Sequence, residues 1–429
     1  MFYAFIILAV AALLVALAIW GARCWGLEAV GRGRLRIPLN RFPDLAGERF
    51  TSRDGLHALA WGLGALALVY GASLLYCGIL GEGVSWSGFH KAWKHYDAYH
   101  YLKLAELGYA GYTEGGQPLF LVFFPLYPWL MRLLHLVIPN YAVCGHLLSS
   151  LCFLGSCYML ARLVTEEFGR KLSRLSLAFL TAYPFAFFFA SIHTESLFLL
   201  LSLACFYFIR KHRYPLAGLF GALAALTRMQ GVFLAVVALA EYCLTEHPLS
   251  KLRRHAWREL WRDLWGKLFW IACMALGVGV YLLLNYVVAG DPFRFLTYQR
   301  QHWYQGFAPF TTSLYKLWQG ALHPTKEYLA YTTWGPQVAL FAFCVAVLLY
   351  GARRLPPVWT LYFLICLLLN YSLNNPLSCC RYIACAFPLP AALAMGAEKR
   401  PGAGRFLLVS YGVLQGVYLF AYLAGKHVC

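Results

Sequence analysis

The stretch from His95 to Tyr109 combines an acidic side chain with aromatic and basic neighbours, between two strongly apolar segments. Asp97 in this stretch is one of only 18 acidic residues in a chain of 429. A carboxylate at the mouth of a membrane protein suits a general base, which takes the proton from an attacking hydroxyl group. The alternative is that Asp97 only caps a short helix over Ala98–Leu107. The residues of the stretch leave both interpretations open.

Two arginines expected on the same side of the membrane lie next to apolar segments. Arg228 stands in a polar interruption, Thr227–Gly231, and Arg381 lies at the start of an apolar run. A buried arginine without a counter-charge is costly, so each either binds a ligand phosphate or pairs with a carboxylate such as Glu195. Arginine can grip phosphate with two hydrogen bonds and is permanently charged. Both kinds of partner remain open for both arginines.

Further polar side chains could complete such a site. His100 follows the candidate base by three residues, so the two can share one helix face; it either orients the base, binds phosphate or lies at the interface. His193 and Glu195 belong to a tight turn expected at the outer face, where Glu195 otherwise caps the next helix. Gln299 and Trp303 are candidates for sugar binding, with packing as the alternative.

The composition is that of a polytopic helical membrane protein. Hydrophobic residues make up 61% and charged residues 13%, and the mean hydropathy is +0.59. The formal net charge of +18 does not indicate nucleic-acid binding, because the basic residues form short clusters between apolar runs, as the positive-inside rule predicts. The 14 cysteines include no C-x-x-C pair, and most lie in apolar runs, where cysteine behaves as a small hydrophobic residue.

The apolar runs predict an all-α fold with about twelve membrane spans and two large outer loops, 81–140 and 289–333. An uncleaved first span, Phe2–Trp20, is expected to lead into an arginine-rich cytoplasmic segment, Arg23–Arg53. The other expected spans include Leu56–Leu80, Tyr141–Leu163, Leu175–Ser191, Ser196–Ile209, Leu268–Val288, Gly335–Tyr350, Val358–Leu373, Ile383–Ala397 and Phe406–Ala424. The chain divides into an N-terminal segment (1–55), a membrane core with both outer loops (56–333) and C-terminal spans (334–429).

Two apolar segments are predicted not to cross the membrane as single helices. Phe120–Ile138 is interrupted by prolines and an arginine, which favours an interfacial or re-entrant helix. Pro215–Leu244 is expected to be two half-length helices, because one full span would place the basic loop Lys251–Lys267 outside. Broken helices at membrane depth are tolerated where they line protein or a wet cavity.

Six blocks that occur in order resemble the PIG-V family of membrane mannosyltransferases, which belongs to the GT-C superfamily. The resemblance runs from about Trp93 to Pro390. Two positions depart from the family pattern: Tyr96 stands where tryptophan is usual, and His193 where an aromatic residue is common. The blocks are Tyr96–Tyr109, Phe123–Pro128, Thr194–Phe198, Leu226–Gly231, Gly290–Trp303 and Arg381–Pro388.

The resemblance implies an inverting transfer of mannose from a polyprenyl (dolichyl-type) phosphate mannose to a hydroxyl of a lipid-linked or exported glycan. The reaction would take place on the non-cytoplasmic face, in the plasma membrane of a bacterium or the endoplasmic reticulum of a eukaryote. The family includes the eukaryotic enzyme that adds the second mannose to the glycosylphosphatidylinositol anchor precursor. The implied roles are base for Asp97, donor-phosphate binding for Arg228, Arg381 and His100, and acceptor or sugar binding for His193, Glu195, Gln299 and Trp303.

Two alternatives to this function remain at the level of the sequence. A transporter or flippase of a lipid-linked saccharide would share the broken helix and the buried cations, and a GT-C enzyme could use a different polyprenyl-phosphate sugar. No cofactor or metal is expected to be obligatory, because the chain lacks a D-x-D motif, although a single Mg²⁺ or Mn²⁺ is compatible with the chemistry. The expected partners are the donor lipid, a glycan acceptor and the bilayer.

Overall fold

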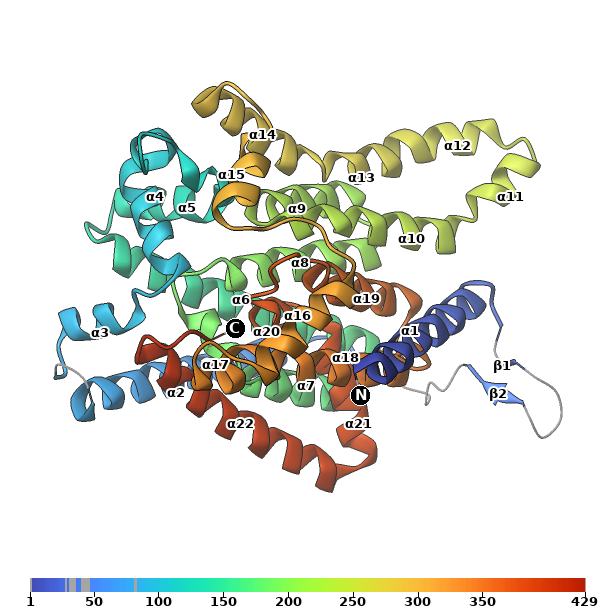
Figure 1. The fold of residues 1–429 in the computed structure, drawn as a ribbon. Coiled ribbons are helices and arrows are strands. Elements are labelled where there is room, and N and C mark those ends of the chain that lie inside the picture. The colour runs from blue at the N-terminus through green and yellow to red at the C-terminus, as the bar shows by residue number, and fades with distance from the viewer. Residues whose placement is uncertain (1, 28, 31–35, 40–46, 81–82, 429) are drawn as a thin grey trace.

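Helices make up almost all of the regular structure (Figure 1). The computed structural model describes residues 2–27, 29–30, 36–39, 47–80 and 83–428. Parts of the arginine-rich segment between Arg23 and Arg53, and the first two residues of the first outer loop, therefore lie outside the described residues. In the described part of that segment, strands β1 (Ala29–Val30) and β2 (Ile37–Pro38) pair antiparallel.

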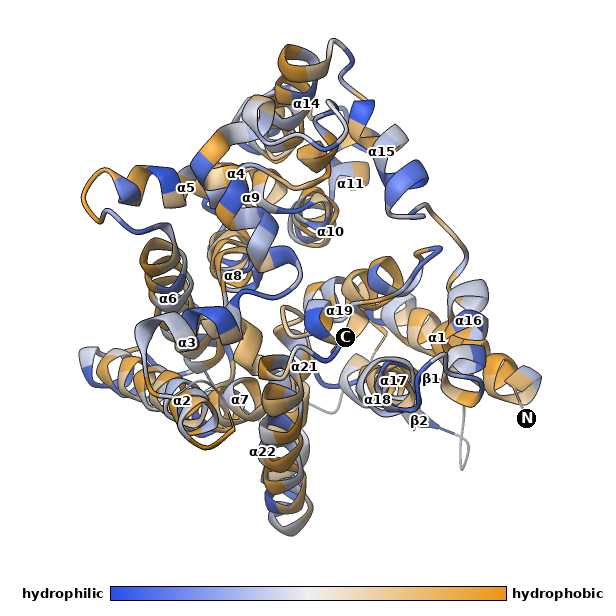
Figure 2. Cartoon of the chain, turned by 60° about the vertical axis from the view of Figure 1, so that its left-hand side comes forward, coloured by the Kyte–Doolittle hydropathy of each residue, from blue (hydrophilic) through white to orange (hydrophobic). Residues whose placement is uncertain are grey.

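Six helical segments are long and apolar enough to cross a membrane, or seven if a pair bent by 42° counts as one span. The chain is therefore an integral membrane protein. The expected number of about twelve spans is not confirmed. Helices α1, α2 and α22 lie at the periphery and are largely hydrophobic (Figure 2). The six segments are α1 (Phe2–Cys24), α2 (Ser52–Ile79), α6 (Tyr141–Phe168), Met229–Glu246, Glu327–Ala352 and α22 (Pro401–Leu423).

Several expected spans are shorter than the roughly 20 residues that a 30 Å hydrocarbon layer requires. The predicted span Leu175–Ser191 is wrong: α7 ends at Ala182, and the separate 3₁₀ helix η3 follows at Ala186–Ala190. Pro184 is the reason, because the residue before a proline is forced out of the helical conformation. The short helices are α7 (Arg170–Ala182), α8 (Glu195–Arg210), α9 (Tyr214–Thr227), α19 (Pro357–Tyr371), α20 (Cys379–Ile383) and α21 (Pro388–Lys399).

The predicted break in the segment 215–244 is confirmed. Helix α9 ends at Thr227, Arg228 is extended (φ −157°, ψ 145°), and the chain continues as η4 (Met229–Phe233) and α10 (Leu234–Glu246). A Cβ at Gly231 would lie 2.3 Å from the Ala224 carbonyl carbon, whereas seven residues of straight helix span about 10 Å. The chain therefore folds back on itself, and only glycine permits this close approach.

The segment predicted as the first outer loop contains short helices that lie around the start of α6. Helix α5 has ten residues, about 15 Å, so the prediction that Phe120–Ile138 does not cross is confirmed. At the end of α5, Leu136 and Val137 are exposed (78% and 84%), which suits an interfacial position. The loop consists of α3 (Trp86–Trp93), α4 (Asp97–Gly111), η2 (Leu119–Val122) and α5 (Leu126–His135).

The remaining elements form one long hairpin and the second outer loop. The hairpin reaches away from α3 and α4 to the opposite end of the molecule, at α11 and α12 (Figure 1). Its elements are α11 (Pro248–Arg253), α12 (Trp257–Asp263), the π-helical segment η5 (Leu264–Leu268), α13 (Phe269–Cys273) and α14 (Leu276–Ala289). The second loop and the next helix are α15 (Arg294–His302), α16 (Phe310–Leu322), α17 (Glu327–Leu329), η6 (Ala330–Trp334) and α18 (Gly335–Ala352).

A buried ionic group joins four helices at the end of α8. Arg210 contacts Glu167 at 2.7 Å and Glu241 at 2.5 Å, and the Trp359 indole donates a hydrogen bond to Glu167. These contacts tie α6, α8, α10 and α19 together. With this end fixed, the opposite end of α8 is held against α4, the α9 break and α20, where the candidate site lies.

Candidate active site

Asp97 is the first residue of α4, and its carboxylate pairs with Arg381 on α20. Arg381 Nη2 donates a hydrogen bond to Asp97 Oδ2 at 2.6 Å, although the two residues are 284 positions apart. The N-cap position belongs to Tyr96, not to Asp97, and Tyr96 has a positive φ of 52°. A non-glycine residue in this conformation is uncommon and marks strain at a turn. The helix-cap interpretation of Asp97 is therefore wrong, and the turn aims its carboxylate at a cation.

Four charged side chains form one connected cluster, which we call the charge quartet: Asp97, Arg381, Glu195 and Arg228. Glu195 Oε1 lies 3.1 Å from Arg381 Nε and 2.9 Å from Arg228 Nη1. Glu195 is 1% exposed, Arg381 7% and Arg228 9%. Two negative and two positive charges balance, which is how buried charges are made tolerable. Both arginines therefore have carboxylate partners, which is the alternative to phosphate binding that the sequence left open.

Glu195 is placed by a turn that lies inside the protein. The tight turn before α8 is expected at the outer face, and Ile192, His193 and Thr194 in it are at most 3% exposed, so the turn is covered by other parts of the protein; its side of the membrane stays a prediction. The reason for the burial is tertiary: the turn packs beneath α4 and the C-terminal end of α22. His193 Nδ1 shares a hydrogen bond with Ser191 Oγ at 2.8 Å, and its ring contacts Tyr101 and Tyr422 edge-on. His193 therefore lies behind the quartet as a packing partner would, and its predicted sugar-binding role stays a prediction.

Aromatic rings cover the two arginines of the quartet. Tyr382 lies between them, with its ring centroid 4.1 Å from the Arg228 guanidinium and 5.0 Å from that of Arg381. Phe198 and Phe188 cover the other sides. Cation–π contacts of this kind stabilise a desolvated cation. Sequence reasoning missed Tyr382, although it directly follows Arg381 in one of the six blocks.

His100 and Trp303 belong to an aromatic cluster that starts one turn after Asp97. The His100 ring stacks on Phe120 at 4.7 Å, and its Nδ1 is 3.0 Å from the Tyr112 hydroxyl. Trp303 contacts the same Phe120 edge-on. Burial lowers the pKa of His100, although Asp97 and Glu114 raise it, so the imidazole is neutral at pH 7. A neutral ring can donate a hydrogen bond to phosphate but adds no charge.

Gln299 lies on α15, in the second outer loop. Its backbone carbonyl accepts a hydrogen bond from the Gln305 amide, and the residue is half-buried. The structure thus places Trp303 and His100 against the same ring, Phe120, and leaves Gln299 four residues earlier on the same loop. The predicted sugar-binding roles of Gln299 and Trp303 stay predictions.

A segment near the C-terminus forms a wall of the site that sequence reasoning missed entirely. The Tyr96 hydroxyl donates a hydrogen bond to the Gly425 carbonyl at 3.1 Å, and the Tyr96 ring meets the His427 ring at 5.2 Å. His427 is in turn anchored to Thr332 and Thr333 of the second outer loop. This end of the chain lies well inside the outline of the molecule (Figure 1). A histidine beyond the last span carries no recognisable pattern, so only the tertiary structure reveals it.

The electrostatic surroundings keep Asp97 ionised. Burial by itself raises the pKa of its carboxyl, but the Arg381 guanidinium, His193 and the hydrogen bond from Arg381 outweigh this, and the pKa lies below the usual value of 3.8. For His427, burial and Arg381 lower the pKa, while Asp97 raises it. The site therefore holds an anionic aspartate next to a neutral histidine at pH 7.

No group of three or more His, Cys, Asp or Glu side chains in the described ranges is arranged to hold a metal ion. The sequence-based expectation that no metal is obligatory stays a prediction.

Replacing Glu195 should destabilise the protein strongly. In Glu195→Gln, Arg228 and Arg381 lose a shared counter-charge at a site that is 1% exposed, and breaking a buried ion pair costs about 3–5 kcal/mol. We expect a fall in the apparent melting temperature in detergent of several degrees.

Glu106→Gln is the matched control, because Glu106 pairs with Lys103 at 2.8 Å on the surface, 48% exposed, where such pairs contribute less than about 1 kcal/mol. Equal melting temperatures for the two variants would show that the quartet does not hold the fold together.

The fold and this cluster together define an integral membrane protein with a buried, charge-balanced site between its helix ends. Residues 118–276 match the model of the dolichyl-phosphate-mannose-protein mannosyltransferase family. The matched stretch includes Glu195 and Arg228, whereas Asp97 and Arg381 lie outside it.

The chain is similar to a solved structure, that of the archaeal oligosaccharyltransferase AglB from Archaeoglobus fulgidus, in complex with an inhibitory peptide and a dolichol-phosphate. The TM-score is 0.43 and the identity 13%, over 86% of this chain and 56% of that chain. This chain thus spans about half the length of AglB. No curated protein matches it in sequence.

Proposed function

We propose that this protein is a GT-C-type glycosyltransferase that transfers mannose from a polyprenyl-phosphate mannose to a hydroxyl of a lipid-linked or exported glycan. The observation that carries the proposal is the contact between the candidate base and the cations: Asp97 Oδ2 is 2.6 Å from Arg381, which shares Glu195 with Arg228. The family match over residues 118–276 supports the same donor chemistry. The PIG-V resemblance supports mannose and the non-cytoplasmic face.

The quartet supplies the groups that the transfer requires. The acceptor oxygen forms a bond to the anomeric carbon as the bond from that carbon to the phosphate oxygen breaks. Asp97 takes the hydroxyl proton, and polyprenyl phosphate leaves with the bonding electrons. Its growing negative charge is stabilised by Arg228 and Arg381, since preorganised cations are most effective where charge develops in the transition state. General-base help is worth about 10²–10⁴-fold.

Arg381 links donor binding to the strength of the base. While it holds Asp97, the lowered pKa of that carboxyl makes it a weak base. A donor phosphate beside Arg381 competes with Asp97 for the guanidinium and thereby raises the proton affinity of the carboxylate. The base then becomes effective only when the donor is in place, which limits reaction in its absence.

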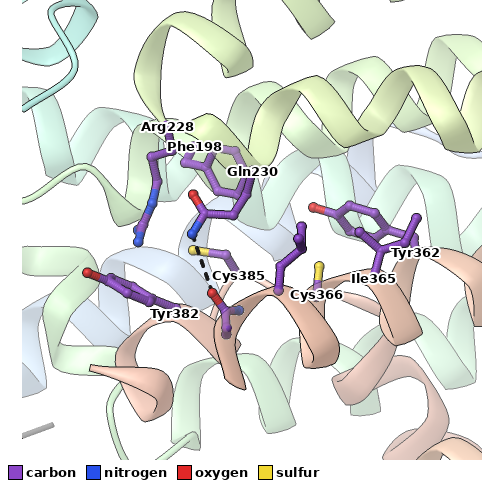
Figure 3. Close-up of a pocket in the computed structure, with 10 residues that line it drawn as sticks. Phe198, Arg228, Gln230, Tyr362, Ile365, Cys366, Tyr382 and Cys385 are labelled. Atoms are coloured by element: carbon purple, nitrogen blue, oxygen red, sulfur yellow. Dashed lines mark hydrogen bonds between the residues drawn. The ribbon is translucent and has the colours of Figure 1, made fainter. Parts of the chain in front are cut away.

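A narrow pocket with mostly apolar walls adjoins Arg228, and its lining would suit a phosphate on a hydrocarbon chain once the side chains move apart. Arg228 and Tyr382 lie at one end and Tyr362 at the other (Figure 3). Between them, Ile365, Cys366 and Leu369 supply apolar walls, with the Gln230–Asn370 hydrogen bond of 3.4 Å beside them. Its volume of about 10 Å³ is about what one water molecule needs. Side chains must therefore move apart to admit the donor.

The transporter alternative predicts charged groups strung through the bilayer, and α8 argues against it. The charged residues of α8 are at its two ends, Glu195 in the quartet and Arg210 in the ionic group with Glu167. The 14 residues between them carry no charge, and fifteen helical steps span about 22 Å. An apolar stretch of this length interrupts a charge relay along the helix.

Incubation of the purified protein with polyprenyl-phosphate mannose tests the proposal. A glycosyltransferase releases polyprenyl phosphate and produces mannosylated acceptor, or slowly free mannose when water is the acceptor. A flippase moves the intact lipid between the leaflets of a proteoliposome without breaking the bond. If polyprenyl phosphate is released from the glucose analogue but not from the mannose lipid, the donor sugar in this proposal changes from mannose to glucose. Release from neither, with flipping of the intact lipid, would overturn the proposal.

Removing the Arg228 side chain should weaken donor binding. We expect the donor Kd of Arg228→Ala to rise about 10- to 100-fold, because a hydrogen bond between charged groups contributes about 1.5–3 kcal/mol. Glu195 keeps Arg381 as its partner in this variant, so the fold should survive.

The control for this variant is Arg300→Ala, which removes an exposed arginine from the second outer loop. Its donor Kd should match the wild type, as measured by tryptophan fluorescence or scintillation proximity. An unaltered Kd in Arg228→Ala would refute the phosphate-binding role.

A further inference from the structure

Three tryptophans form an exposed row on the hairpin at the end of the molecule opposite to the quartet. Trp257, Trp261 and Trp265 follow at intervals of four residues and are 61%, 64% and 54% exposed. The row is continued by Phe269: the ring centroids of Trp261 and Trp265 are 6.0 Å apart, and those of Trp265 and Phe269 are 5.8 Å apart. Three large aromatic side chains in water carry a large hydrophobic cost, so we ask what covers this row.

A cluster of ion pairs fixes the other face of the same helix. Asp263, which is 1% exposed, lies 2.6 Å from Lys251 and 3.0 Å from Lys267, and Glu246 contacts the same two lysines at 2.7 Å and 2.5 Å. The Tyr242 hydroxyl donates to Asp263 as well. Because α10, α11 and α12 are joined in this way, the tryptophan row is held outward on a rigid hairpin.

The charge left on the exposed face is strongly positive. Lys251 and Lys267 are neutralised by Glu246 and Asp263, as just described. The remaining charged residues between positions 251 and 267 are four arginines, Arg253, Arg254, Arg258 and Arg262, and one acid, Glu259. All five are exposed. The surface around the tryptophans therefore carries a net charge of +3, from four positive charges and one negative charge.

Arginines and tryptophans share one open helical face. It is formed by Arg258, Glu259, Trp261, Arg262, Trp265 and Gly266. The space above Gly266 is open, since a Cβ built there would meet nothing within 4 Å. Arg258 and Arg262 are one helical turn apart and so reach the same point in space. Two guanidinium groups beside an aromatic wall match a phosphate that carries apolar chains.

The row also lies where an apolar span begins. Downstream of Trp265, the outward side chains of the hairpin are apolar: Phe269, Leu276 and Leu283 are 43%, 61% and 60% exposed. Tryptophan concentrates where a membrane span meets the aqueous phase, and arginines near the cytoplasmic surface attract anionic lipids. The basic loop from Lys251 to Lys267 is expected on that side.

We propose that this face of α12 and η5, the tryptophan row with Arg258 and Arg262, is a binding surface for the headgroup of an anionic phospholipid in the cytoplasmic leaflet. The two arginines hold the lipid phosphate, and Trp261 and Trp265 lie against the glycerol and the upper acyl chains. The surface is independent of the proposed glycosyl transfer, because it shares no residue with the quartet.

Native mass spectrometry of the purified full chain tests this surface with equal amounts of phosphatidylglycerol and phosphatidylcholine. The wild type should retain phosphatidylglycerol preferentially. In Arg258→Gln/Arg262→Gln the apparent Kd for phosphatidylglycerol should rise about tenfold or more, since each basic residue near an anionic surface contributes substantially. Trp261→Ala/Trp265→Ala should weaken the binding of both lipids.

Arg400→Gln/Arg405→Gln is the matched control, because it removes two exposed arginines from another basic stretch expected on the cytoplasmic side. This variant should bind phosphatidylglycerol within about twofold of the wild type. The proposal is overturned if the Arg258/Arg262 variant retains the preference, or if the control loses it equally, which would indicate diffuse charge attraction. Displacement of the lipid by soluble glycerol phosphate at matching concentration would also overturn it. Unchanged melting temperatures show that the ion-pair cluster is intact in all variants.

Discussion

Asp97→Asn should lower the turnover of donor and acceptor by about 10²–10⁴-fold, the contribution of a positioned general base. Asparagine has the shape of aspartate and can still accept the hydrogen bond from Arg381, so the 2.6 Å contact can persist. It cannot take a proton from the acceptor hydroxyl. The loss should therefore fall on kcat, with the donor Kd changed little, as measured by release of radiolabelled sugar and by direct donor binding.

Asp291→Asn is the control for this substitution. Asp291 lies in the second outer loop, where its Oδ1 accepts a hydrogen bond from the Phe293 amide at 2.9 Å. This is a turn role that asparagine fulfils equally well. Its activity should stay within about twofold of the wild type. Full activity in Asp97→Asn would remove Asp97 from the role of base and leave the carboxylate as a structural partner of Arg381.

Arg381→Ala should lower kcat/KM for the donor by about 10²–10³-fold, because it removes a preorganised cation beside the leaving phosphate. Arg381 also contacts Glu195 at 3.1 Å and the Tyr382 hydroxyl at 3.2 Å, so the variant should melt at a lower temperature as well. Arg381→Lys separates the two effects. It keeps the positive charge and much of the stability, but not the planar fork that binds phosphate bidentately.

Arg381→Ala should also shift the pH dependence of activity in a defined direction. Burial raises the pKa of Asp97 and Arg381 lowers it. Without Arg381 the pKa of Asp97 rises, so a larger fraction of the carboxyl is protonated at acid pH and unable to act as a base. The acidic limb of the pH–kcat/KM profile of Arg381→Ala should therefore lie at higher pH than that of the wild type. An acidic limb that does not move would contradict the direct coupling of the two side chains.

Much of the membrane architecture could be read from local patterns. The apolar runs that became α1, α2, α6 and α22 are long, and the break in the segment 215–244 was predicted from the charge of the loop that follows it. Such features depend on residues close in the chain, which is why they are readable. Span lengths in the middle were misjudged where a proline acts: Pro184 ends α7, and α21 begins at Pro388, so the expected span Ile383–Ala397 is divided between α20 and α21.

The residue types of the site were recognisable from the sequence, but their partners were not. Asp97, Glu195, Arg228 and Arg381 stand out because charged groups are rare in an apolar chain and expensive to bury. Which of them pair depends on contacts across 284 positions, as for Asp97 and Arg381. The burial of the turn at His193 and the wall formed by His427 likewise depend on which helices pack together. Local sequence determines the cost of placing a charge in the membrane, whereas only the packing of distant segments decides which opposite charge offsets it.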